Sequence, residues 1–361
     1  MSTSHIRPIA IYLPQFHPVP ENDEWWGKGF TEWTNVTKAR PLFKGHYQPR
    51  LPADFGFYDL RVIDTLIEQA AMASAYGIYG FSFYHYWFHG KRLLHEPVDL
   101  ILKSKQPDFP FLLFWANESW SRRWLGDEKE VLIGQHYSTE DDRAHAEWLC
   151  QNVFSDSRYI KVNGKPVFVV YRPFNLPDVP QFIATFREVA EKHGFPGVYL
   201  VGCNAHSSSQ LHLFDNILHF EPQLGILKDA FHDDWKWSRY TSNWFNFGVR
   251  DGKLKLYDYN KVKKQLMNRT LKRKFIPCPF VGWDNSARRG EKGVVMLNQN
   301  AKMFGESLKW AKNAVQQFPE QEQMVFINAW NEWAEGNHLE PCLNYGHQYL
   351  EQVKKIFVEN A

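Results

Sequence analysis

Short apolar segments alternate with longer amphipathic ones along most of the chain. The apolar segments are rich in β-branched and aromatic residues and form near-continuous hydrophobic runs, which is typical of parallel strands covered on both faces. We predict eight such strands, at about 8–13, 77–84, 109–115, 166–171, 197–202, 216–220, 275–282 and 323–329. The amphipathic segments between them predict helices at 59–76, 140–154, 178–193, 259–271 and 298–318.

The regular alternation of strand and helix predicts a closed α/β fold, a (β/α)8 TIM-type barrel, with residues 1–361 forming a single catalytic domain. An open, doubly wound sheet is the alternative fold. Two long segments, 14–58 and 222–258, lack periodicity, and both follow predicted strands. In a barrel they would form long loops on the C-terminal face, which holds the active sites of such enzymes.

Charge and cysteine content exclude several classes of protein. The chain carries 42 basic and 40 acidic residues, a net charge of +2, which argues against a nucleic-acid binder that works by neutralising phosphates. Its four cysteines are widely spaced and form no Cys-x-x-Cys, so they indicate neither a zinc site nor a disulfide framework. The first residues lack the features of a secretion signal, and no apolar run is long enough to span a bilayer. We therefore expect a cytoplasmic protein without a membrane span.

Aromatic residues are unusually frequent, with 15 Trp, 16 Tyr and 28 Phe. Buried Trp and Tyr need partners for their N–H and O–H groups, so a core has limited use for so many of them. Sugar-binding clefts use this mixture, because flat rings stack on the C–H faces of sugars while the polar tips bond hydroxyls. The composition therefore indicates either a carbohydrate cleft or a large aromatic core.

The strongest candidate chemistry lies where the last predicted strand ends. The apolar run 324–329 continues directly into Trp330-Asn-Glu-Trp-Ala-Glu-Gly336, which places Glu332 and Glu335 three residues apart. One helical-type turn would bring the two carboxylates together. Two carboxyl groups that flank one bond, one protonated and one ionised, are the standard equipment of glycoside cleavage. The alternative is a helix N-terminus whose acidic residues only stabilise the helix dipole.

Polar and aromatic residues follow other predicted strands in the same way. Asn117 and Glu118 come after the third strand and offer an amide and a carboxylate to sugar hydroxyls. The alternative is that Arg122 or Arg123 merely neutralises Glu118. Because the carboxyl ends of barrel strands meet on one face, we expect these residues to line one cleft. The remaining candidates for this cleft are Trp25, Trp33, Tyr84, His85, Trp283 and Trp333.

Motifs for other chemistries are missing from the sequence. It has no Gly-x-x-x-x-Gly-Lys-Ser/Thr phosphate loop, no Gly-x-Ser-x-Gly nucleophile elbow and no Asp-x-Asp motif. His85 and His89 are four residues apart, but they lie at a strand end and no His-Glu-x-x-His occurs, so a metal site is not indicated. We expect neither a metal nor a cofactor, and an oligosaccharide or polysaccharide as the binding partner.

Several segments of the chain resemble the WbsX-type family of bacterial polysaccharide-biosynthesis proteins, which is related to glycoside hydrolase family 99. The resemblance covers nearly the whole chain. It rests on the segments Ala10-Ile-Tyr-Leu-Pro-Gln-Phe-His17, Gly29-Phe-Thr-Glu-Trp-Thr-Asn-Val36, Gly80-Phe-Ser-Phe-Tyr-His-Tyr-Trp87, Trp115-Ala-Asn-Glu118 and Asn331-Glu-Trp-Ala-Glu335.

Family 99 enzymes are retaining, endo-acting α-mannosidases on a (β/α)8 barrel, with a Glu-x-x-Glu pair that Glu332 and Glu335 match in position. The resemblance implies that Glu332 removes the proton from the substrate 2-hydroxyl, which attacks the anomeric carbon to give a 1,2-anhydro sugar. It implies that Glu335 protonates the leaving group and then activates water, with Glu118 as an accessory carboxylate. This scheme differs from the general one, in which an enzyme carboxylate is the covalent nucleophile.

These observations together predict a retaining glycoside hydrolase that acts on mannose-like bonds of a bacterial polysaccharide. Two alternatives remain open. WbsX-type proteins are commonly labelled glycosyltransferases, so the same pocket could serve transfer in O-antigen or other surface-polysaccharide biosynthesis. A non-catalytic glycan-binding protein that kept the aromatic cleft would show the same aromatic composition.

Overall fold

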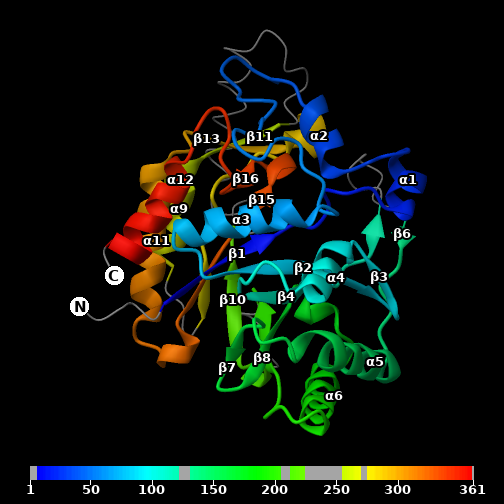
Figure 1. Cartoon of the computed structure of the whole chain (residues 1–361). Coiled ribbons are helices and arrows are strands. Elements are labelled where there is room, and N and C mark those ends of the chain that lie inside the picture. The colour runs from blue at the N-terminus through cyan, green and yellow to red at the C-terminus, as the bar shows by residue number, and fades with distance from the viewer. Residues whose placement is uncertain (1–5, 122–130, 205–211, 224–253, 270–274, 360–361) are drawn as a thin grey trace.

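Eight parallel strands form a nearly closed barrel at the centre of the molecule (Figure 1). The computed structural model describes residues 6–121, 131–204, 212–223, 254–269 and 275–359. Strand β14 pairs with β1, and a parallel bridge from Phe280 to Asn328 joins the chain after β12 to the end of β14. The strands follow one another in chain order: β1 (Arg7–Tyr12), β2 (Gly80–Phe88), β4 (Phe111–Trp115), β8 (Lys165–Val170), β9 (Tyr199–Cys203), β10 (Asn216–Phe220), β12 (Ile276–Cys278) and β14 (Met324–Ile327).

The barrel strands are buried on both faces, which explains why their sequences are near-continuous apolar runs rather than alternating ones. Leu113 of β4, Val169 of β8 and Val325 of β14, for example, have no solvent exposure. The (β/α)8 barrel and the eight strands predicted from the sequence are confirmed.

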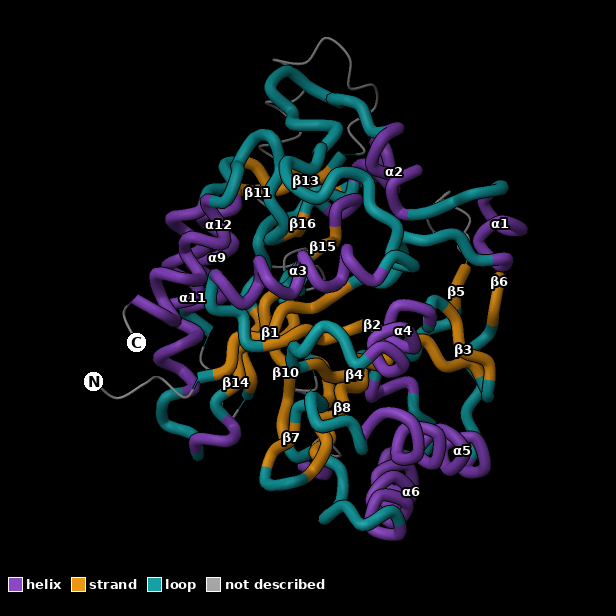
Figure 2. The backbone as a smooth tube through the Cα atoms, in the orientation of Figure 1, coloured by secondary structure: helices purple, strands orange, loops and turns teal. Residues whose placement is uncertain are grey.

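Helices cover the outside of the barrel, as the purple segments of Figure 2 show. Helix α5 packs beside α6, and α11 beside α12. Several begin at a side chain that caps the helix: the Asp178 carboxylate, for instance, accepts the Gln181 N–H at the start of α6. The covering helices are α3 (Ile63–Ala75), α4 (Glu96–Ser104), α5 (Thr139–Leu149), α6 (Val179–Lys192), α9 (Tyr259–Met267), α11 (Ala301–Val315) and α12 (Gln348–Lys354).

Loops and short elements gather beyond the carboxyl ends of the barrel strands (Figure 2). The irregular segment 14–58 contains α1 (Pro20–Trp26) and α2 (Glu32–Lys38), whereas most of the segment 222–258 lies outside the described residues. The other short elements there are β3 (Lys91–Leu93), β5 (Trp120–Ser121), β6 (Val131–Ile133), β11 (Lys255–Asp258), α10 (Ser286–Arg289), β13 (Val294–Leu297), β15 (Asn331–Glu332) and β16 (Asn337–His338). Strand β7 (Lys161–Val162) instead pairs with the first residues of β8, at the amino ends of the barrel strands.

The structure also bears on disulfides, membranes and metals. All four cysteines are buried and free. No helix in the part of the chain that the structure describes is long and apolar enough to cross a membrane. Within the same part, no group of three or more His, Cys, Asp or Glu side chains is arranged to hold a metal ion.

Candidate active site

A cavity of about 290 Å³ lies at the carboxyl ends of the barrel strands. One set of lining side chains is aromatic and comes from strand ends and the loops after them: Trp26, Tyr84, Tyr86, Trp120, Tyr171, Phe220 and Trp283. A second set is polar and includes Gln15, Glu118, Ser121, Arg288, Asn328, Glu332 and Glu335. The cavity therefore combines flat apolar faces with a few convergent polar groups, which is the usual make-up of a small-molecule site.

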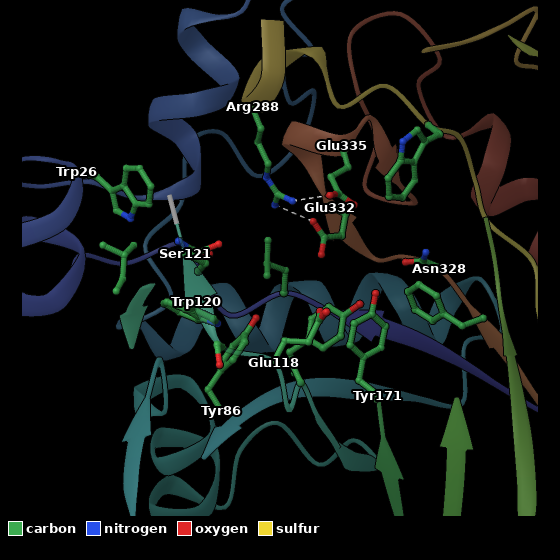
Figure 3. Close-up of a pocket in the computed structure, with 18 residues that line it drawn as sticks. Trp26, Tyr86, Glu118, Trp120, Ser121, Tyr171, Arg288, Asn328, Glu332 and Glu335 are labelled. Atoms are coloured by element: carbon green, nitrogen blue, oxygen red, sulfur yellow. Dashed lines mark hydrogen bonds and ion pairs between the residues drawn. The ribbon is translucent and has the colours of Figure 1, made fainter. Parts of the chain in front are cut away.

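The two predicted glutamates meet in this cavity. Glu332 ends β15, and the next three residues, Trp333–Glu335, form one turn of 3₁₀ helix. Gly336 then takes a left-handed backbone, with φ +58°, and the chain returns as β16 alongside β15. The turn places both carboxylates on the cavity side, so the three-residue spacing does bring them together (Figure 3).

Arg288, from α10, joins the two carboxylates (Figure 3). Its Nη2 donates to Glu332 Oε2 at 3.0 Å, and its Nη1 donates to Glu335 Oε1 at 2.6 Å. Its Nε donates to a third carboxylate, Glu32 of α2, at 2.7 Å. The Arg288 side chain is 8% exposed, so these charge-assisted bonds form in a site largely shielded from water.

The surroundings of the acid pair favour its neutral form. Burial raises the pKa of Glu332 and of Glu335, while the Arg288 guanidinium opposes that rise in both. The negative charge of Glu32 raises the pKa of both further, and Glu335 does the same to Glu332. Because the two groups interact, their protons belong to the pair, and the surroundings favour keeping a proton on it.

A buried network holds the turn between the two acids in place. The Trp333 Nε1–H donates to Glu340 at 2.6 Å, and Glu340 also accepts bonds from Tyr58 and Gln69. The Trp333 ring stacks on His338, with 3.9 Å between the ring centroids. Trp333 therefore anchors the backbone that carries the acids.

A second network holds the chain that carries Arg288. The Asp284 N–H donates to the Glu335 carbonyl at 2.6 Å. The Asp284 carboxylate is hydrogen-bonded to His46 at 2.7 Å, accepts a bond from Gln48 at 2.8 Å and one from the Ser286 hydroxyl at 2.6 Å. The arginine and the acid turn are thus fastened to each other through the backbone as well as through the side chains.

Tyr84, Glu118 and Trp283 also line the cavity, as the sequence predicted. Glu118 lies across the cavity from the acid pair (Figure 3). Its partner is Arg172, whose Nε donates to Glu118 Oε1 at 2.9 Å, in an ion pair that is partly exposed. Arg122 and Arg123, one of which was the alternative partner for Glu118, lie outside the described residues.

Two predicted cleft residues have structural contacts instead. Asn117 is fully buried; its Nδ2 donates to the Arg172 carbonyl and its Oδ1 accepts the Arg172 N–H, which ties the ends of β4 and β8 together. His85 stacks on Trp148 and is hydrogen-bonded to His145 at 2.9 Å, between the barrel and α5. Burial lowers the pKa of His85 to about 3. Neither of these two side chains lines the cavity.

Three further candidates from the sequence, Trp25, Trp33 and Trp333, do not line the cavity either. Trp25 packs edge-on against Trp120 and so supports a lining residue from behind. Trp33 donates its Nε1–H to the Tyr58 carbonyl and packs against Trp333. Trp33 and Trp333 pack between the loops. Both can be buried there because each indole N–H donates to a protein acceptor.

Some residues in or beside the cavity were missed by the sequence analysis. Tyr86 could have been found, because it lies two residues after Tyr84 and side chains two apart in a strand share a face. Arg288 and Glu32 gave no such signal, since neither directly follows a barrel strand. Their partnership depends on tertiary contacts between distant segments.

Solved structures share this architecture. The chain is similar to a "Glycoside hydrolase-like protein", with a TM-score of 0.61 and 16% identity, covering 99% of this chain and 95% of the other. It is similar to the GH99 endo-α-mannosidase of Bacteroides thetaiotaomicron, with a TM-score of 0.59 and 14% identity, covering 99% and 98%. At these identities the similarity shows the fold alone.

The barrel, its aromatic cavity with paired acids, and the family to which the chain belongs support a glycan-processing enzyme. The chain belongs to the family described as Glycosyltransferase WbsX, whose model matches residues 8–353. It is 38% identical over 353 residues to two proteins named "Uncharacterized protein WxcX", from strains B100 and ATCC 33913 of Xanthomonas campestris pv. campestris. The alignments cover 96% of this chain and 49% of each relative, so the chain spans about half their length.

Proposed function

We propose that this protein is a retaining glycoside hydrolase that cleaves mannose-like bonds in a bacterial polysaccharide. The observation that carries the proposal is the pair Glu332 and Glu335, which share one buried guanidinium at the wall of an aromatic cavity. Glycoside cleavage requires one protonated and one ionised carboxyl group on either side of a single bond, and this site favours that state.

The proposed reaction has two steps that use each acid twice. In the first, Glu332 takes the proton of the substrate 2-hydroxyl, and that oxygen attacks the anomeric carbon. The bond to the leaving sugar breaks, and Glu335 gives its proton to the departing oxygen. In the second, Glu335 takes a proton from water, which attacks the anomeric carbon and opens the 1,2-anhydro ring, while Glu332 returns its proton to the 2-oxygen. Two displacements at one carbon give net retention.

The charge around the cavity favours a neutral sugar over a nucleotide diphosphate. Glu118, Glu332 and Glu335 line it, and the guanidinium of Arg288 is already hydrogen-bonded to three carboxylates. A diphosphate would meet repulsion from these acids, whereas a sugar ring can stack on the aromatic faces. This argument supports hydrolysis over transfer from a nucleotide sugar.

The family description favours transfer as the second candidate function. The same anhydro sugar could be opened by the hydroxyl of another sugar rather than by water. The two outcomes differ in the product, which is either a free reducing end or a new glycosidic bond.

We expect Glu332→Gln and Glu335→Gln each to lower kcat for an aryl α-mannoside or an α-mannosyl oligosaccharide by about 10²–10⁴-fold. Each amide keeps the shape of the side chain but cannot exchange a proton. Release of the aryl group measures the rate, and ¹H NMR of the first product measures its anomeric configuration. Retained configuration is expected.

The matched control is Glu306→Gln, an exposed glutamate on α11, which should keep the wild-type rate. Undiminished turnover in either active-site variant would contradict the assignment. Inverted product would contradict the two-step reaction. A wild-type protein that binds the oligosaccharide but never cleaves it would identify a glycan-binding protein, and turnover only with a nucleotide sugar would identify a transferase.

A further inference from the structure

Glu32 is a fully buried carboxylate that does not line the cavity. It begins helix α2, in the long irregular segment before β2, far in sequence from the acid pair. Its Oε1 accepts the Arg288 Nε–H at 2.7 Å. Its Oε2 is buried and has no hydrogen-bond partner among the described residues. A buried polar atom without a partner is costly to a fold, so its presence beside the acid pair calls for a reason.

The cluster has more negative than positive groups. One guanidinium donates to three carboxylates, through Nε to Glu32, Nη1 to Glu335 and Nη2 to Glu332. If all three acids were ionised, one cation would face two buried anions, Glu32 and Glu332, and a partly buried one, Glu335. Desolvation and repulsion make that state expensive, and the least costly response is for the cluster to keep a proton.

Among the described residues, the other groups that face the cluster do not balance it. Tyr84 and Tyr86 face it from β2, and Tyr171 faces it from the position directly after β8; burial raises the pKa of all three, so they stay neutral. Arg289, next to Arg288, lowers the pKa of Glu335, but it is a minor contribution beside burial and Arg288. Glu118 is already paired with Arg172.

We propose that Glu32 is a positioning residue that, by sharing Arg288, keeps one proton on the Glu332–Glu335 pair at neutral pH. Without Glu32, Arg288 would serve the pair alone, and both acids could ionise at a lower pH. With Glu32, the pair enters the reaction with the proton that the leaving group needs. The use of this proton in catalysis rests on the proposed function, but the presence of the proton on the pair does not.

The variant Glu32→Gln removes the charge and keeps an oxygen that can accept from Arg288. Loss of a nearby negative charge disfavours the protonated form, so the pKa of the pair should fall by about one to two pH units. Glu32→Asp is the matched control, because it keeps the charge and changes only the length of the side chain. Its pair should titrate near the wild-type pH.

The measurement is a ¹³C NMR titration of the full chain labelled with [¹³Cδ]glutamate, without substrate. The signals of the pair are assigned by their loss in Glu332→Gln and Glu335→Gln. An unchanged midpoint in Glu32→Gln would overturn the proposal, and so would an equal fall in Glu32→Asp. If Glu32→Gln loses its native circular dichroism, Arg288→Gln replaces it: removal of the cation should raise the midpoint, and a fall or no change would overturn the proposal.

Activity gives a second readout that separates the two proposals. With a substrate that the wild type cleaves, both limbs of the pH–rate profile should move to lower pH in Glu32→Gln by the shift seen in the titration. If the wild type cleaves nothing, the proposed function fails, while the titration still decides the role of Glu32.

Discussion

A single buried guanidinium donates to three carboxylates at the centre of the site. Removing one member of a buried ionic cluster is costly, because the remaining charges lose their compensation in a medium that solvates them poorly. The same removal at a partly exposed pair costs little, since water replaces the lost partner. The chain offers both cases, Arg288 and Arg172, each bonded to a carboxylate that lines the cavity.

We expect Arg288→Met to lower the free energy of unfolding by about 3–5 kcal/mol at neutral pH. Three buried acids would be left without their cation, and they would respond by taking up protons. Because a fully protonated pair has no base for the 2-hydroxyl, the rate should fall with stability. Urea unfolding and kcat on the same preparation measure the two effects.

Arg172→Met provides the comparison, because its side chain is 42% exposed and its partner Glu118 is 35% exposed. Its loss should change the free energy of unfolding by no more than about 1 kcal/mol. Equal stability losses in the two variants would show that burial does not determine how much stability is lost when the arginine is removed.

At the scale of elements, the acid pair depends on one tight connection, the 3₁₀ turn between β15 and β16. Gly336 closes this turn with a left-handed backbone, and a Cβ there would lie 2.7 Å from Arg50 Nε and 2.9 Å from Asp284 Cβ. Asp284 cannot easily give way, because His46 and Gln48 hold its carboxylate. The turn therefore has room for glycine alone.

We expect Gly336→Ala to destabilise the protein by about 3 kcal/mol, from backbone strain together with the collision. It should also lower kcat, because the backbone would have to move at the residue next to Glu335. Urea unfolding and aryl-glycoside turnover measure both. The control is Gly346→Ala, where φ is +51° but a Cβ would meet nothing within 4 Å; it should cost only the strain, about 1 kcal/mol, and leave kcat unchanged. Similar results in the two variants would refute the steric argument.

The elements show what the sequence could predict. Long apolar runs identify barrel strands, because nothing else in a soluble α/β protein buries both faces so completely. Helices α4 and α12 were missed, since nine and seven residues give too few turns for a clear period. The pairing of β11 with β13 was also missed, because it joins segments that are far apart in the chain and no local pattern encodes it.

For the site residues, too, local sequence patterns predicted some features and tertiary contacts determined others. Glu332, Glu335, Glu118 and Trp283 line the cavity, and a switch from apolar to polar residues at the end of a barrel strand is the signal that singled them out in the sequence. The direction of His85 was not predictable, because in a strand apolar on both faces the alternation of inward and outward side chains leaves no trace in the sequence.

For the whole molecule, the burial of His85 and His145 couples folding to pH. Burial lowers the pKa of His85 to about 3, and it lowers the pKa of His145 well below the ordinary value of 6.5. The folded protein therefore keeps both rings neutral, while the unfolded chain protonates them near pH 6.5. Below that pH the unfolded state binds more protons, so this contribution to stability is complete above pH 6.5 and is lost as the pH falls toward 3.

Each such histidine adds up to about 1.4 kcal/mol per pH unit to the slope of the unfolding free energy in that window. We expect His145→Gln to be less stable than the wild type at neutral pH, because the His145 ring stacks on Trp87. Its unfolding free energy should nevertheless fall less steeply between pH 6 and pH 4, by about 1.4 kcal/mol per pH unit. Urea unfolding at a series of pH values measures the slope. His89→Gln, which removes an exposed histidine just after β2, should keep the wild-type slope; if His145→Gln keeps it too, the buried histidine pair does not govern acid stability.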